Sequence, residues 1–231
     1  MMMAETLYNV YKALPLTTLG RLYTSILMKH PRIANYTRTG GAWRVESVSG
    51  DAMALKNGEI SLIADRYHGT ILLFESLSWK PLYLPKGGIK GKTVLDVGMG
   101  CGETTAFFFE NGAKKIVGVE IMEGCAQNAK QNAKRNGWDL EVFGEPFKLE
   151  HLAIPHDFLK MDIDGGERLL LDYKNELGSC RIEMHPSLIG PIIGRWGMAA
   201  TITPDIRDKI VEKFGLTRIK SAGTEIFGRD S

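Results

Sequence analysis

The spacing of hydrophobic and polar positions divides the chain into a first part of mixed character and a longer second part with a regular alternation of elements. In residues 4–30 the leucines and tyrosines recur at helical spacing, which predicts two short helices interrupted at Pro15 and ended by Pro31. This segment is basic, with one acid, Glu5, against six cations: Lys12, Arg21, Lys29, Arg32, Arg38 and Arg44. It is either a solvated helix face that packs on the main domain or a surface for an anionic partner.

Strand-like alternation follows between Trp43 and Phe74. Asn57-Gly58 lies between two β-like runs and is a strong signal for a hairpin. We interpret residues 65–69 as a polar loop and residues 70–74 as a further strand. The first part, residues 1–84, is therefore predicted to be an appendage of two helices and an antiparallel β cap.

Residues 85–231 alternate short apolar runs with helical patterns, as a parallel sheet covered by helices does. The predicted parallel strands are residues 94–97, 116–119, 140–143, 158–163 and 180–184. The predicted helices are residues 103–111, 122–136, 167–177 and 204–214, and the last two strands, 216–220 and 224–227, form an antiparallel pair. The expected fold is a Rossmann-like α/β domain whose mainly parallel sheet has seven strands, with helices on both faces.

A glycine turn joins the first strand of this domain to its first helix. Gly98, Gly100 and Gly102 follow the strand directly, and Glu120 stands at the end of the next strand. Glycine permits positive φ and a close approach of a ligand to the backbone. In such a βαβ unit the turn holds the ligand and the strand-end acid binds ribose hydroxyls. The sequence therefore predicts a nucleoside site.

The string LDVGMGCG, residues 95–102, resembles motif I of the class I S-adenosylmethionine (SAM)-dependent methyltransferases. The resemblance implies that Asp96 helps to hold the methionine end of SAM and that Glu120 binds both ribose hydroxyls. Ile121, which follows Glu120, is assigned to the same site. Glu145 follows the third strand, where these enzymes commonly contact adenine, although a plain turn would give the same residues.

A second group of polar residues follows the fourth and fifth strands. Asp162 and Asp164 come at the end of one strand, and Glu183 and His185 at the end of the next. Ligands of open α/β sheets bind at the carboxyl ends of the strands, so we expect these four side chains to share one crevice. His185 is a candidate proton acceptor because histidine titrates near neutrality, and Asp162 is the alternative.

The strings LKMDIDGGE and RIEMH, residues 159–167 and 181–185, resemble a pair of strings in FkbM-type methyltransferases. The matching residues are Lys160, Asp162, Gly165, Glu167, Glu183 and His185. Asp164 and Gly166 depart from the usual pattern, in which a glutamate and a larger residue stand. The family mostly methylates hydroxyl groups and lacks the Asn/Asp-Pro-Pro-aromatic string of amine and base methyltransferases, as this chain does.

Composition narrows the classes of function. The net charge of +2 gives no strong nucleic-acid or membrane signal, and no apolar run is long enough for a membrane span. The three cysteines have no paired spacing, which predicts neither disulfides nor a metal site and favours a cytoplasmic setting. Oligomeric state is not addressed by the sequence.

These observations predict a SAM-dependent methyltransferase, most simply an O-methyltransferase of a small molecule or sugar. SAM is assigned to Asp96, Gly98, Gly100, Gly102, Glu120, Ile121, Glu145 and Asp162. The catalytic candidates are His185 and Asp162, and Asp164 and Glu183 are assigned to the acceptor. Two alternatives remain: an RNA methyltransferase anchored by the basic N-terminal arm, and a non-catalytic SAM-binding module.

Overall fold

The structure is a computed structural model that describes residues 43–185, 202–220 and 225–230. The predicted N-terminal helices, the cations of the basic segment other than Arg44, and the connection at residues 186–201 lie outside the described residues. The chain forms two compact units that divide between Leu77 and Ser78. In the described ranges, no helix combines the length and the apolar character that crossing a bilayer requires.

The first unit contains a three-stranded antiparallel sheet of β1 (Arg44–Ser49), β2 (Ala52–Asn57) and β3 (Ile60–Asp65). The predicted hairpin is confirmed, since Asn57 pairs with Ile60 and Gly58 takes a φ of +56° in the turn. Alternate residues of β2 and β3 are buried, among them Met53, Leu55, Leu62 and Ala64. The alternating sequence pattern therefore builds one apolar face.

The loop and strand predicted for residues 65–74 are wrong, because these residues begin helix α4 (Arg66–Tyr83). The backbone N–H of His68 donates to Asp65 Oδ1 at 2.9 Å, so Asp65 caps the start of the helix. Gly69 packs closely against β2, where a Cβ atom would lie 2.8 Å from Met53 Sδ. This glycine thus serves close packing inside a helix and does not mark a turn.

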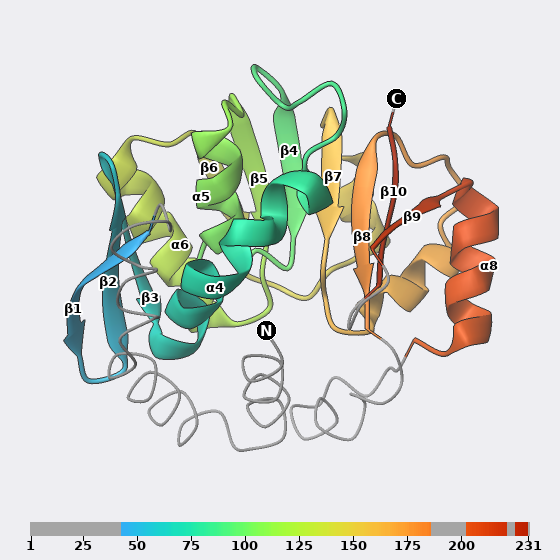
Figure 1. Cartoon of the computed structure of the whole chain (residues 1–231). Helices are drawn as coiled ribbons and strands as arrows, with labels where there is room; N and C mark the ends of the chain where they lie inside the picture. Colours follow the sequence, from blue (N-terminus) through green and yellow to red (C-terminus); the bar gives the residue numbers. More distant parts are fainter. Residues whose placement is uncertain (1–42, 186–201, 221–224, 231) are drawn as a thin grey trace. The chain divides into compact units, whose positions relative to one another are not determined.

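The second unit contains the predicted mainly parallel sheet of seven strands. Its strands are β4 (Thr93–Val97), β5 (Lys115–Val119), β6 (Leu140–Phe143), β7 (Phe158–Met161), β8 (Cys180–Met184), β9 (Thr217–Lys220) and β10 (Glu225–Arg229). The order across the sheet is β6-β5-β4-β7-β8-β10-β9, which Figure 1 shows from β6 to β9. The strands are parallel except β10, which is antiparallel to both β8 and β9.

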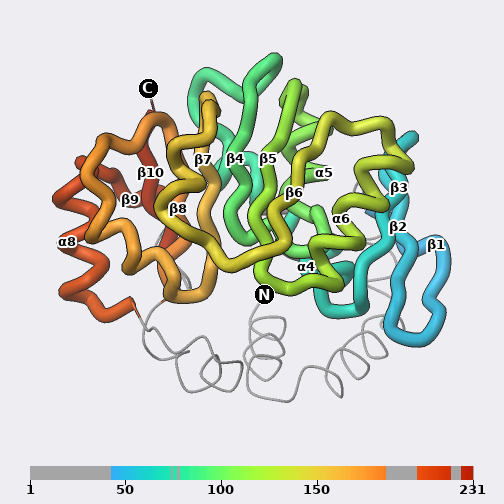
Figure 2. Tube along the Cα trace, turned by 180° about the vertical axis from the view of Figure 1, so that it is seen from behind, coloured from blue at the N-terminus to red at the C-terminus, as the bar shows by residue number. Residues whose placement is uncertain are grey.

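The helical segments of this unit are α5 (Glu103–Glu110), α6 (Glu123–Asn136), α8 (Pro204–Phe214) and the 3₁₀ segments η1 (Leu149–Ala153) and η2 (Gly166–Leu171). The segment η2 corrects the longer helix predicted for residues 167–177. It lies beside α8 in both views (Figures 1 and 2). The Lys213 ammonium of α8 donates to the carbonyl of Leu171 at 2.5 Å.

Residues two positions apart on the central strands contribute to the same side of the apolar core. Leu95 and Val97 of β4, with Leu159 and Met161 of β7, belong to one apolar cluster. This cluster also contains side chains of the helical segments and of the neighbouring strands: Leu170, Ile182, Met184, Ile210 and Phe214. This packing holds β4, β7 and β8 in place, and the polar residues of the candidate site follow the ends of these strands.

Candidate functional site

The glycine turn leads from the end of β4 into α5. Gly98, Gly100 and Gly102 have φ values of +75°, +58° and +98°, all in the region that glycine adopts readily. A Cβ atom on Gly98 would lie 1.8 Å from the backbone carbonyl oxygen of Asp162. Only glycine fits there, because the turn presses directly on the chain that leaves β7.

Glu120 lies next to this turn, at the end of β5. Its two carboxylate oxygens accept the backbone N–H groups of Gly100 at 2.9 Å and Met122 at 2.7 Å. The two residues after it, Ile121 and Met122, are 51% and 50% exposed. The glycine turn, the strand-end carboxylate and two exposed apolar side chains therefore follow one another at the carboxyl ends of β4 and β5.

Asp96 is fully buried beneath the turn. Its Oδ2 accepts the hydroxyl groups of Thr104 at 2.7 Å and Thr105 at 3.0 Å, both in the first turn of α5. Its Oδ1 lies 3.5 Å from the ammonium of Lys160. Asp96 therefore connects the start of α5 to β7, and direct contact with a ligand stays a prediction.

The structure brings together the four polar residues assigned to the ends of β7 and β8. His185 Nδ1 lies 3.7 Å from Asp162 Oδ1, and His185 Nε2 lies 3.6 Å from Asp164 Oδ1 and 3.8 Å from Glu183 Oε1. These separations are too long for hydrogen bonds. The buried Nδ1 atom has no hydrogen-bond partner among the described residues. The imidazole is therefore surrounded by carboxylates without being fixed by any of them.

The surroundings of this cluster shift two pKa values. Burial, reinforced by Glu183, raises the pKa of Asp162 well above its usual range, although Lys160 and His185 offset part of the effect. Burial disfavours the charged form of His185, but the carboxylates of Asp162, Asp164, Glu183 and Glu167 outweigh it and raise its pKa. The two groups are close enough to titrate as a pair.

Glu167 shapes the loop that presents the two aspartates. Its buried carboxylate accepts the N–H groups of Ile163 and Gly165, both at 2.8 Å. Between them Asp164 has a φ of +52°, which is uncommon for a residue with a side chain. The FkbM-like string contains Glu167, but its role as an internal clamp follows only from these contacts.

Tyr83, at the end of α4, is a site residue that sequence reasoning missed. Its hydroxyl donates to Glu183 Oε2. The two residues are a hundred positions apart in the sequence, and no local motif surrounds Tyr83. Only the folded backbone could associate it with the end of β8.

Asp162, Asp164 and His185 each offer one potential ligand atom for a metal ion, and these atoms lie within 4.8 Å of one another. The buried ammonium of Lys160 already places a positive charge 3.9 Å from Asp162. A divalent cation in the same cluster would be repelled by this charge. Lys160 therefore offsets part of the negative charge that a metal ion would meet in this cluster.

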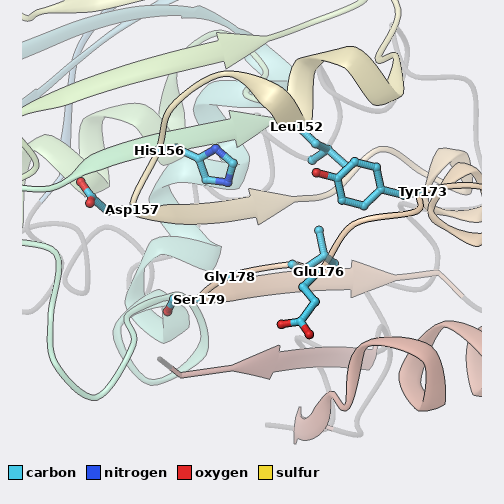
Figure 3. Close-up of a pocket in the computed structure, with 8 residues that line it drawn as sticks. Leu152, His156, Asp157, Tyr173, Glu176, Gly178 and Ser179 are labelled. Carbon is cyan, nitrogen blue, oxygen red and sulfur yellow. The ribbon is translucent and has the colours of Figure 1, made fainter.

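Two other features stand apart from this cluster. Glu145 forms ion pairs with Lys148 at 2.6 Å and His151 at 3.1 Å, so its assignment to adenine stays a prediction. A cavity of about 170 Å³ is bounded partly by His156 and Tyr173, which Figure 3 labels. It lies where β7 and β8 begin, at the opposite edge of the sheet from the glycine turn.

The comparisons with known proteins find partial relatives. A protein of Methanocaldococcus jannaschii whose name describes an N5-glutamine methyltransferase is 42% identical over 55 residues, which cover 24% of this chain and 28% of that protein. The ribosomal protein L11 methyltransferase of Vibrio campbellii is 40% identical over 57 residues, covering 24% and 19%. The chain thus spans less than a third of either relative. No protein-family model matches it.

Among solved structures, the ribosomal protein L11 methylase of Lactobacillus delbrueckii subsp. bulgaricus is 22% identical, with a TM-score of 0.43, over 62% of this chain and 72% of that one. The magnesium protoporphyrin IX methyltransferase of Synechocystis is 19% identical, with a TM-score of 0.46, over 63% and 76%.

Proposed function

We propose that this protein is a SAM-dependent methyltransferase that methylates a hydroxyl group of a small molecule. The observation that carries the proposal is the contact between the glycine turn and the chain that leaves β7. Gly98 of the nucleoside turn lies against the backbone of Asp162, which belongs to the cluster around His185. A methyl donor held by the turn would therefore have its reactive end beside a cluster that can accept a proton.

The turn and the end of β5 supply the groups that would hold SAM. The glycines add no side chain to the turn, the Glu120 carboxylate offers lone pairs to ribose hydroxyls, and the exposed Ile121 and Met122 offer an apolar surface to the adenine. When bound, SAM would supply an electrophilic methyl group. The chain's part is to align an acceptor oxygen with that methyl group, which by itself can contribute about 7–11 kcal/mol to lowering the barrier.

The cluster at the ends of β7 and β8 would bind the acceptor and take its proton. We assign this role to the Asp162–His185 pair, and acceptor binding to Asp164 and Glu183. Because the pKa of His185 is raised, its neutral form gains population only above the ordinary histidine value of about 6.5. Transfer should therefore accelerate as pH rises through a value higher than 6.5.

The choice of oxygen as acceptor rests on the two FkbM-like strings and on the residues that follow β7. These read Asp162-Ile163-Asp164-Gly165-Gly166, without the Asn/Asp-Pro-Pro-aromatic string of amine and base methyltransferases. The two sequence relatives carry names that describe methylation of proteins. A protein acceptor is therefore the second candidate, and an RNA acceptor that uses the basic arm is the third.

The test is transfer of label from methyl-tritiated SAM to three substrate pools: a small-metabolite extract, total protein and total RNA. We expect label in a small molecule. Blocking the hydroxyl groups of the extract beforehand should prevent this labelling. Label confined to protein or RNA would overturn the small-molecule assignment. If SAM binding is undetectable by calorimetry, the methyltransferase assignment itself fails.

Variants then separate the two halves of the site. Glu120→Ala should lose SAM affinity, since ribose hydroxyls lose a charged acceptor, whereas His185→Gln should bind SAM normally. His185→Gln should turn over about 10²–10⁴ times more slowly than the parent. Its rate of methyl transfer should also no longer increase as pH rises. If His185→Gln turns over normally and Asp162→Asn is inactive, the proton acceptor is Asp162 alone.

A further inference from the structure

Lys160 is a buried cation at the centre of the sheet. It lies on β7, where it pairs with Asp96 of β4, and it is 1% exposed. A buried ammonium is costly unless carboxylates and hydrogen-bond acceptors compensate it. The role of the Lys160 charge can therefore be inferred from the groups that its ammonium contacts.

The ammonium of Lys160 touches both halves of the site. It donates to the carbonyl oxygen of Gly98 at 2.8 Å, inside the nucleoside turn. It also lies 3.5 Å from Asp96 Oδ1 and 3.9 Å from Asp162 Oδ2. One side chain thus joins the turn, the acid below the turn and the acid that faces the acceptor.

We propose that Lys160 is a positioning residue that holds the glycine turn in its binding shape through Gly98 and places a positive charge beside Asp162, where an acceptor would bind. The second half of this statement rests on the proposed function, because it takes Asp162 as an acceptor-facing group. Lys160 itself is too buried to touch an acceptor. Its pKa is raised, since Asp96, Asp162 and Glu183 outweigh the effect of burial, so it stays charged and cannot serve as the base.

The charges around Asp162 show why the lysine matters for protonation. Glu183 on β8 and Asp164 on the following loop disfavour its ionised form, as burial does, whereas Lys160 and His185 favour it. Lys160 is the permanent cation of these two, because His185 loses its charge as pH rises. Without Lys160, Asp162 would hold its proton to a higher pH.

The experiment compares Lys160→Met, which keeps an unbranched side chain of similar length and removes its charge, with Lys174→Met at an exposed lysine. SAM affinity is measured by calorimetry, and the titration of Asp162 by carboxyl-carbon NMR, assigned with Asp162→Asn. We expect Lys160→Met to bind SAM about tenfold more weakly, as loss of one buried hydrogen bond to the turn would cause. We expect its Asp162 to titrate at a higher pH, while Lys174→Met changes neither quantity.

A folded Lys160→Met protein with unchanged SAM affinity and an unchanged Asp162 titration would overturn the inference. If the single variant fails to fold, Lys160→Met is combined with Asp162→Asn, which removes both charges. The double variant should bind SAM more weakly than Asp162→Asn alone, and equal affinity would refute the role at Gly98. Neither readout needs an acceptor, so failure to transfer methyl groups would count against the proposed function and not against this role of Lys160.

Discussion

Replacing Glu167 with glutamine is a direct test of the loop that presents Asp162 and Asp164. Each oxygen of the buried Glu167 carboxylate accepts one backbone N–H, from Ile163 and from Gly165, at 2.8 Å. Glutamine has the same shape but only one oxygen. Its amide nitrogen would face one of the two N–H donors, so that bond becomes a repulsion.

The magnitude follows from these two contacts. Loss of one charge-assisted hydrogen bond costs about 1.5–3 kcal/mol, and the N–H group left without a partner costs about 1–3 kcal/mol. Part of this is offset, because burial raises the pKa of Glu167 and a neutral amide is easier to bury. We expect a net loss of about 2–4 kcal/mol in the free energy of unfolding.

The assay is urea unfolding followed by tryptophan fluorescence, with Glu150→Gln as the matched control at an exposed glutamate. Methyl transfer is measured on the folded fraction. It should fall in Glu167→Gln because the aspartates lose their fixed loop, while SAM affinity is retained. A change within about 0.5 kcal/mol, the usual range for surface substitutions, would refute the reasoning.

Two further predictions concern the second unit, one at the glycine turn and one at Asp230. Gly98→Ala should abolish SAM binding and cost more than the about 1–2 kcal/mol of left-handed strain, because its Cβ would collide with the Asp162 carbonyl. Gly58→Ala, with positive φ but nothing within 4 Å, should cost only the strain in thermal unfolding. Burial tends to raise the pKa of Asp230, but its hydrogen bond from Arg181 at 2.7 Å outweighs this and lowers it. The stability from this pair is therefore present above the unfolded value of about 3.9 and is lost as pH falls through the lower folded pKa. Asp230→Asn should be destabilised by about 1–2 kcal/mol at pH 7 in urea unfolding, and its difference from the parent should shrink as pH falls below about 3.9; a difference that does not change with pH would contradict the assignment.

Much of the second unit could be predicted because its signals are local. Buried parallel strands read as short apolar runs, and the glycines after β4 mark a turn that other residues cannot form. The sheet rule then brings Asp162 and His185 together without knowledge of any side-chain contact. The cluster at the ends of β7 and β8 is therefore accessible from the sequence.

Residues 66–74 show where such reasoning fails. Thr70, Ile71 and their apolar neighbours have the composition of a strand, and Gly69 suggests a turn. The cap at Asp65 and the packing of Gly69 on Met53 decide for a helix, and the second of these is a tertiary contact that propensity does not contain.

The roles of Lys160, Glu167 and Tyr83 were inaccessible for a related reason. The first two residues stand in recognisable strings, but only the fold tells which atoms they touch. Tyr83 lies in another segment altogether.

The position of β10 has a consequence for how the protein reaches its folded state. This strand follows every other strand in sequence, yet it lies between β8 and β9 and pairs with both. Until it docks, β8 exposes a row of unpaired backbone groups and β9 has no partner. An exposed strand edge is a template for association with other chains, so a chain in which β10 has not yet docked is prone to aggregate. Because Glu183 of β8 pairs with Ile226 of β10, docking of β10 also orders the strand end that carries the proposed acceptor site.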